Sequence, residues 1–154
     1  MPYEYVAAFP PATYAMFEGK TTPAQNVARY VAGSAMLLAG VSHWTFARKP
    51  FQAQVPSWVP LDKDSTVLAS GVVEIGLGAG MLLLKGENRV RLGIGLATFF
   101  VAIFPGNWAQ YKHHRSMPGL DTDRKRFVRL FFQPVFIAVA LWSTGAWDML
   151  RKNP

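Results

Sequence analysis

Residues 65–84, STVLASGVVEIGLGAGMLLL, decide the fold because they form a long apolar stretch whose one charged side chain is Glu74. At ~1.5 Å per residue, a helix of this length crosses a hydrocarbon layer of ~30 Å. The stretch therefore predicts a membrane-spanning helix. Its glycines, among them Gly76 and Gly80 in small-xxx-small spacing, and Gly33 and Gly40 earlier in the chain predict close helix packing.

Three further apolar stretches flank it, at about residues 30–47, 92–109 and 130–147. Each is about 18–20 residues long, and none alternates strictly between apolar and polar residues as barrel strands do. None shows the polar face that a helix of a soluble bundle needs. We therefore predict an all-α integral membrane bundle of four transmembrane helices, formed by residues 27–150, after an N-terminal interfacial extension at residues 1–26.

The composition agrees with this fold class. Hydrophobic residues make up 51% of the 154 residues and charged residues 16%, against about 25% charged in soluble domains. The absence of cysteine excludes disulfides, Fe–S clusters and thiolate metal sites formed by this chain. The formal charge of +7, beside bilayer-length segments, indicates anionic lipid headgroups and not nucleic acid.

The connecting loops suggest partners. Residues 48–64 contain PSWVP at positions 56–60, an amphipathic segment expected in the headgroup layer, and residues 110–126 form a basic loop suited to a soluble partner. We expect contacts with the lipid bilayer and with another protein chain or a second copy of this one. Basic residues are shared almost equally between the two predicted membrane faces, which leaves the orientation open.

Polar residues inside the spans are the candidate functional groups. An ionised Glu74 near the middle of its span costs ~2.5–3.5 kcal/mol, so it should face the interior of the bundle. Because the chain reverses direction at every loop, His43, Asn107, Arg129 and Gln133 should form one polar layer at the same membrane face. Glu74 should lie a few turns deeper, in a cleft open toward loops 48–64 and 110–126.

Each of these residues also has a purely structural interpretation. Arg129 at a helix start can anchor the helix in the headgroup layer, and His43 beside Trp44 can be an interfacial imidazole. Asn107 and Gln133 can join helices at ~0.6 kcal/mol each, and Glu74 with Arg129 can be a structural ion pair. His113 and His114 in a polar loop are expected to be solvated. No metal site is predicted, and haem is not expected because histidine occurs in one span alone.

Five stretches at these positions resemble the DoxX family of small four-helix membrane proteins. They are Ala39-Gly40-Val41-Ser42-His43-Trp44, Pro56-Ser57-Trp58-Val59-Pro60, Ser70-Gly71-Val72-Val73-Glu74-Ile75, Phe104-Pro105-Gly106-Asn107 and Arg129-Leu130-Phe131-Phe132-Gln133. The resemblance covers about residues 28–147. It implies a multi-pass protein of the prokaryotic cytoplasmic membrane that is linked to quinone and works with another chain.

Two functions remain open at this point. In the first, the chain is a quinone-linked redox subunit or accessory component of a membrane oxidoreductase. His43, Asn107, Arg129 and Gln133 then bind the quinone, Glu74 carries the proton, and Glu74, His43 and Arg129 form the catalytic group. In the second, the chain is a non-enzymatic membrane scaffold, assembly factor or lipid-binding subunit. A proton-coupled transporter ranks third, because four spans are few for one chain.

Overall fold

The computed structural model describes residues 20–152, and these residues form helices and loops without a strand. The all-α prediction is thus confirmed for this part of the chain. The elements are α2 (Pro23–Trp44), α3 (Arg48–Phe51), the short 3₁₀ helix η1 (Gln52–Gln54), α4 (Lys63–Leu83), α5 (Gly86–Lys112), α6 (Asp123–Thr144) and α7 (Ala146–Lys152).

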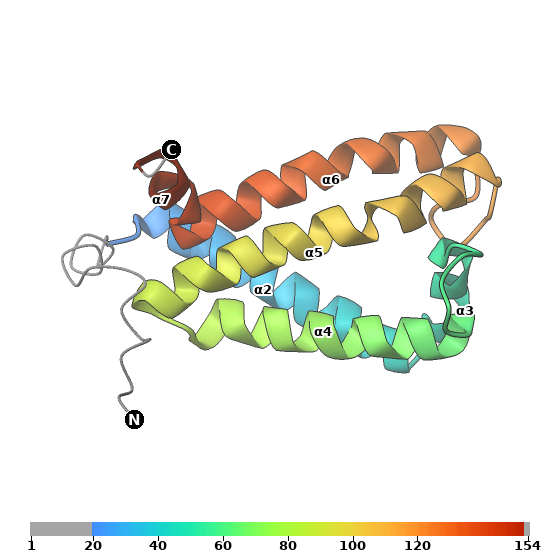
Figure 1. The fold of residues 1–154 in the computed structure, drawn as a ribbon, viewed down its shortest axis with the longest axis horizontal. Coiled ribbons are helices and arrows are strands. Elements are labelled where there is room, and N and C mark those ends of the chain that lie inside the picture. Colours follow the sequence, from blue (N-terminus) through green and yellow to red (C-terminus); the bar gives the residue numbers. More distant parts are fainter. Residues whose placement is uncertain (1–19, 153–154) are drawn as a thin grey trace, which may run out of the picture.

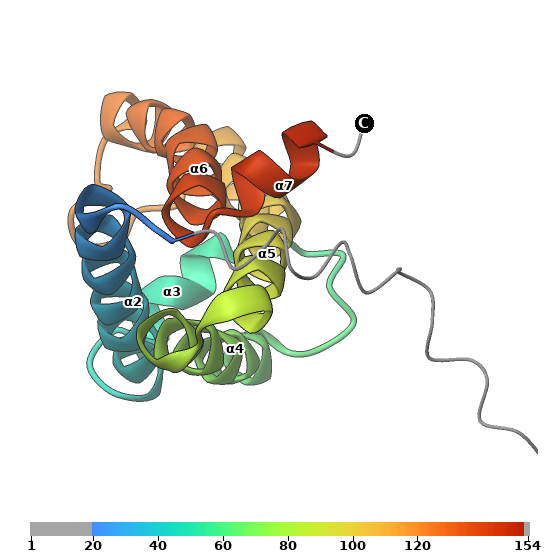
Figure 2. The same cartoon turned by 90° about the vertical axis from the view of Figure 1, so that its left-hand side faces the viewer.

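The long helices form an antiparallel bundle of two pairs, α2 with α4 and α5 with α6 (Figures 1 and 2). The short elements α3 and η1 lie at one end of the bundle, and α7 lies at the other end together with the start of α2. We call these the α3 end and the α7 end. Most of the predicted N-terminal extension, residues 1–19, lies outside the described residues.

Three helices, α4, α5 and α6, are long and apolar enough to cross a membrane. The predicted span at residues 30–47 corresponds to α2, which is not one of these three. This helix starts earlier than predicted, at a capping box in which Thr22 and Gln25 bond each other's backbone N–H groups. The polar residues of its first turns, including Arg29, lower its mean hydropathy.

Glycines allow α2 and α4 to pack with their backbones close together. A Cβ atom added at Gly40 would lie 2.7 Å from the Gly71 carbonyl oxygen, and one at Gly78 would lie 2.8 Å from the Gly33 carbonyl oxygen. The contact therefore uses two glycine pairs, about two helical turns apart along each helix. Gly76 of the predicted small-xxx-small pair has no atom within 4 Å of such a Cβ and takes no part in it.

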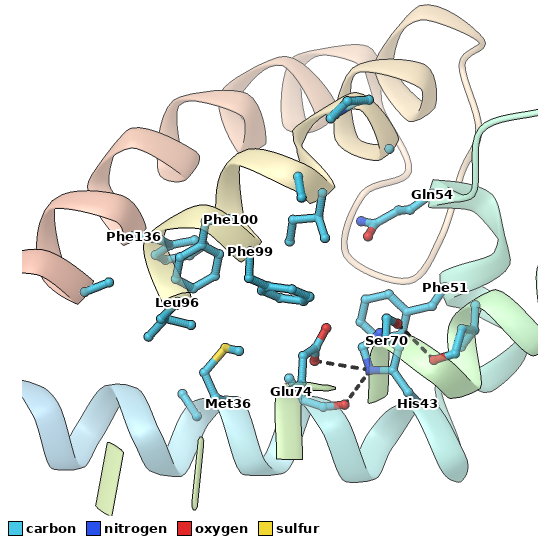
Figure 3. Close-up of a pocket in the computed structure, with 18 of the residues that line it drawn as sticks. Met36, His43, Phe51, Gln54, Ser70, Glu74, Leu96, Phe99, Phe100 and Phe136 are labelled. Atoms are coloured by element: carbon cyan, nitrogen blue, oxygen red, sulfur yellow. Dashed lines mark hydrogen bonds and ion pairs between the residues drawn. The ribbon is translucent and has the colours of Figure 1, made fainter. Parts of the chain in front are cut away.

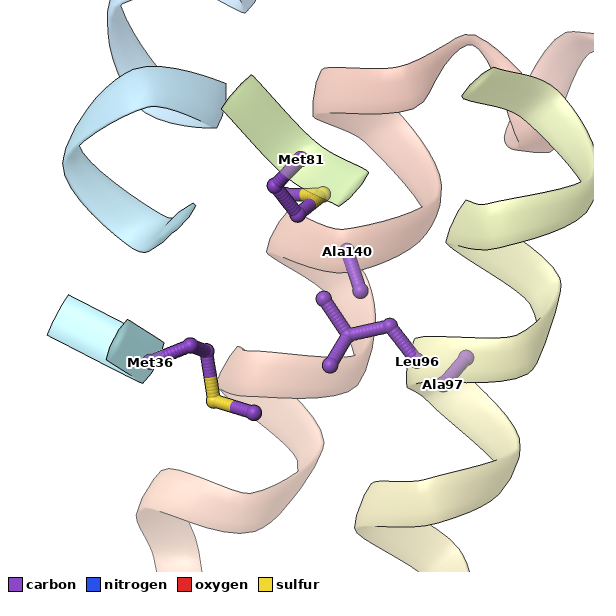
Figure 4. Packing of buried hydrophobic residues seen from close by; sticks show 5 residues of the cluster. All are labelled: Met36, Met81, Leu96, Ala97 and Ala140. Atoms are coloured by element: carbon purple, nitrogen blue, oxygen red, sulfur yellow. The ribbon is translucent and has the colours of Figure 1, made fainter. Parts of the chain in front are cut away.

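The α7 end of the bundle is closed by apolar packing and by two buried arginines. The core consists of Met36, Met81, Leu96, Ala97 and Ala140, which come from all four long helices (Figure 4). Arg29 donates to the Met81 carbonyl oxygen at 2.5 Å, and Arg89 donates to that of Thr144 at 2.9 Å. Both acceptors lie in the last turn of a helix, where carbonyls lack intrahelical partners and favour a positive charge.

Gly40→Ala tests the close contact of α2 with α4. The added methyl group meets backbone atoms that cannot move aside, so we expect the free energy of unfolding in detergent to fall by about 1–3 kcal/mol. Gly76→Ala is the matched control in the same helix pair, and its higher helix propensity should leave stability unchanged or raise it by up to ~1 kcal/mol. Equal thermal midpoints for the two variants would contradict the observed packing.

Candidate functional site

A cavity of about 680 Å³ lies between the α2–α4 pair and the α5–α6 pair and extends from the α3 end along the core. Its wall is mostly apolar, with alanines and valines from α2 and α6 and the rings of Phe99, Phe100 and Phe136 (Figure 3). The charged or ionisable side chains in its wall are His43, Glu74 and Arg129. A large apolar cavity with a few polar groups has the size and character of a small-molecule site.

His43 and Glu74 form a buried pair in this wall. His43 is 5% exposed and Glu74 is 7% exposed, and the His43 Nδ1 atom lies 3.5 Å from Glu74 Oε2. The same Nδ1 atom is 2.6 Å from the Ala39 carbonyl oxygen. Because a carbonyl oxygen only accepts, this short contact assigns a proton to Nδ1 and leaves Nε2 available to another group.

The carboxylate of Glu74 is left without a hydrogen-bond donor. Its Oε2 atom is buried, and no atom of residues 20–152 makes a hydrogen bond to it. Phe51 of α3 stacks on the His43 ring with centroids 3.9 Å apart and so fixes the orientation of the imidazole. A buried acceptor that lacks a donor within the described chain is an incomplete polar site, and a bound ligand would complete it.

Arg129 reaches the cavity from α6 and is held there by its neighbours. It donates to Gln133 Oε1 at 3.1 Å, and its guanidinium group lies 5.4 Å from the centre of the Phe136 ring. Asn107 donates to the same Gln133 oxygen at 3.1 Å, and Gln133 Nε2 donates to the Phe100 carbonyl oxygen at 2.5 Å. Gln133 therefore joins α5 to α6 and positions Arg129.

These five residues are the ones predicted from the sequence, and they fall into two groups in the structure. His43, Glu74 and Arg129 line the cavity, whereas Asn107 and Gln133 lie behind its wall and bond to each other. A pair of Glu74 with Arg129 was considered from the sequence. In the structure the partner of Glu74 is His43. The reason is that Gln133, one turn further along α6, supplies the acceptor for Arg129.

Sequence analysis missed the contribution of the segment after α2. Residues predicted to lie in the headgroup layer instead place Phe51, Gln54 and Trp58 in the cavity wall. Gln54 donates to Gln110 Oε1 at 3.0 Å, which ties η1 to the end of α5. The amphipathic character of the segment indicates that one of its sides is covered. It does not reveal by what, because these contacts join residues far apart in the chain.

The geometry defines a class of protein: an apolar helical bundle with a buried acid–imidazole pair in a large internal cavity. The chain belongs to the family described as "Domain of unknown function (DUF8561)", which matches residues 32–144. This region contains all of the ionisable residues in the cavity wall. No curated protein and no solved structure matches the chain.

Gln133→Leu tests the arrangement that holds Arg129. Gln133 is 1% exposed, and removing its amide leaves the buried Asn107 side chain and the half-buried Arg129 side chain without their shared acceptor. We expect the free energy of unfolding to fall by about 1–3 kcal/mol, measured as a lower thermal midpoint in detergent. Phe132→Leu, at the exposed neighbouring position, is the control and should change little. Wild-type stability of Gln133→Leu would show that the shared acceptor is dispensable.

Proposed function

We propose that this chain is a four-span membrane protein that binds a quinone in its internal cavity, as a subunit or accessory component of a membrane oxidoreductase. The observation that carries the proposal is the buried Glu74 carboxylate beside His43, whose Oε2 atom receives no hydrogen bond from residues 20–152, in the wall of an apolar cavity of about 680 Å³. The resemblance to the DoxX family supports the same assignment and favours the prokaryotic cytoplasmic membrane.

The fourth span in this proposal is α2. It lies along α4, and its outward side chains are apolar: Val27, Val31 and Leu38 are 63%, 65% and 72% exposed. Its one arginine, Arg29, is turned inward and is 5% exposed. An apolar outer surface with the charge directed into the bundle is what a lipid-facing helix requires.

The residues present fit a quinone, which has a flat apolar ring and two carbonyl acceptors, and whose reduced quinol form has two hydroxyl donors that suit the Glu74 carboxylate. Arg129 and the Nε2 atom of a protonated His43 are the donors available to these acceptors, and aromatic side chains of α5 and α6 match the ring. When bound, a quinone supplies two-electron chemistry coupled to protons. Glu74 and His43, whose side chains face each other, can hold and exchange a proton at the cavity wall.

Electrons must reach this site from another protein or from a group that such a protein carries. The chain has no cysteine, and within residues 20–152 no three His, Asp or Glu side chains are grouped so that they could hold a metal ion. The proposal therefore includes a second chain as electron donor or acceptor. The basic loop between α5 and α6 is a suitable docking surface for it.

The second candidate is a structural or lipid-binding subunit without redox function. It is favoured by the mostly apolar cavity wall, which also suits an acyl chain. In that case Glu74→Gln or Arg129→Ala would reduce the amount of folded protein. Quinone binding measured on folded protein distinguishes the two functions, because only the first requires it.

Cysteine labelling tests whether α2 crosses the membrane. Because the chain contains no cysteine, Lys20→Cys and Lys49→Cys each introduce one reactive site, before and after α2. We expect a membrane-impermeant maleimide to label them from opposite sides of sealed vesicles. Lys63→Cys, at the start of α4, should follow Lys49→Cys. Labelling of the first two from the same side would rule out α2 as a span.

Glu74→Gln tests the proposed quinone site. Protein in lipid nanodiscs is titrated with the reduced, quinol form of a benzoquinone that carries a decyl tail, and a saturable change in tryptophan fluorescence reports binding, since Trp58 lies in the cavity wall. Loss of the charge-assisted hydrogen bond from the quinol hydroxyl to the Glu74 carboxylate, ~1.5–3 kcal/mol, should weaken binding about tenfold or more.

The matched control is Glu87→Gln, which makes the same chemical change at a half-exposed residue paired with Arg91 at the opposite end of the bundle. It should bind like the wild type. If neither the wild type nor Glu74→Gln shows saturable binding, the proposed function is wrong.

A further inference from the structure

The cavity is elongated, and its polar groups are gathered toward one end. His43 and Arg129 mark that end, while Ala28 of α2 and Val139 of α6 line the other. Fifteen residues of helix separate Ala28 from His43, which corresponds to roughly 20 Å of length. Between them α2 contributes Ala28, Ala32, Ala35 and Ala39, a row of small side chains on one face of the helix. The cavity is therefore a slot with a polar end and a long apolar arm.

The apolar arm reaches the surface between α2 and α6. Val31, Ala35 and Val135 line the cavity and are themselves exposed. The two helices are joined at the α7 end, where Gln25 Nε2 donates to the Trp142 carbonyl oxygen at 2.8 Å. Along the arm the small alanine side chains leave space between the helices, and this opening faces the surroundings of the bundle.

The α3 end of the cavity is closed by the chain itself. The segment that follows α3 lies at this end of the bundle (Figure 1) and contributes Gln54, Pro56 and Trp58 to the wall. It packs tightly on α5, since a Cβ atom at Gly106 would lie 2.5 Å from the Gln54 carbonyl oxygen. On α5, Ala102 and Pro105 also line the cavity and are exposed. The opening between α2 and α6 is the one that runs along the alanine row, so it is the one that leads from the apolar arm.

We infer that the ligand is a quinone with a long apolar tail, which enters sideways from the bilayer between α2 and α6. Its ring lies at the polar end near Glu74 and His43, and its tail follows the alanine row and leaves past Ala35. This inference rests on the proposed function and adds the class of quinone and its route. A quinone without a tail would leave the apolar arm unfilled and forgo the van der Waals contacts that a tail makes with the alanine row.

The experiment compares two benzoquinones with the same ring substituents, one without a tail and one with a decyl tail, on wild-type protein in nanodiscs. Affinities are expressed per quinone concentration in the membrane, so that partitioning of the tail into lipid is removed. We expect the tailed quinone to bind at least tenfold more tightly. Equal affinities would overturn the inference while leaving the quinone site intact. Absence of saturable binding by either compound would overturn the proposed function as well.

Two phenylalanine variants locate the route without adding a tryptophan. Ala35→Phe narrows the opening between α2 and α6, and Ala138→Phe makes the same change at an exposed position of α6 that does not line the cavity. We expect Ala35→Phe to weaken binding of the tailed quinone about tenfold, with little effect on the tail-less one, and Ala138→Phe to leave both unchanged. Wild-type binding of the tailed quinone by Ala35→Phe would overturn the inference. Val31→Phe, at the same opening, replaces Ala35→Phe if that variant does not fold.

Discussion

The contact between the backbones of α2 and α4 at Gly40 and Gly71 is the constraint on which the rest of the structure depends. A Cβ atom at Gly71 would lie 2.8 Å from the Cβ atom of His43, so the absence of a side chain there is what lets the imidazole sit beside α4. Glu74 follows one turn after Gly71, on the same helix face. Close packing at a glycine pair therefore brings an acid and an imidazole from two separate helices into one buried pair.

The two ends of the bundle use their polar side chains differently. At the α7 end, Arg29 and Arg89 bond carbonyl oxygens in the last turns of α4 and α6, and the apolar core lies beside them. At the α3 end, Gln133 joins α5 to α6 within one pair, and Gln54, in the segment after α2, bonds Gln110 of α5 and so links the two pairs. The cavity begins at this end and extends along the core, since Met36, Leu96 and Ala140 belong to both. A polar crosslink needs only two side chains in register, so it fixes the distance between helices without filling the space that separates them.

Much of this arrangement could be predicted from the sequence, and the rest depends on contacts that sequence patterns do not encode. Antiparallel spans bring His43, Asn107, Arg129 and Gln133 to one end, and the cost of burying Glu74 turns it inward. The hydrogen-bond partner of Arg129 was not predictable, because Gln133 and Glu74 are both acceptors within reach of a long side chain. Neither was the role of residues 48–58, which follows from their packing on α5. The helix α2 begins before the predicted span, since the capping box at Thr22 lies in a polar stretch ahead of the apolar run.

The hydrogen bonding of Glu74 distinguishes a structural role of this residue from a functional one. A buried acid kept for structure gains most when each of its oxygen atoms accepts a hydrogen bond, because an unpaired acceptor costs about 1–3 kcal/mol. Gln133 meets this standard, with both its oxygen and its nitrogen bonded. Glu74 does not: its Oε2 atom is buried 3.5 Å from the His43 Nδ1 atom, whose proton is directed to the Ala39 carbonyl oxygen. The bundle thus satisfies the amide that joins its helices and leaves the acid in its cavity wall unsatisfied, which is the arrangement expected where a ligand provides the missing donor.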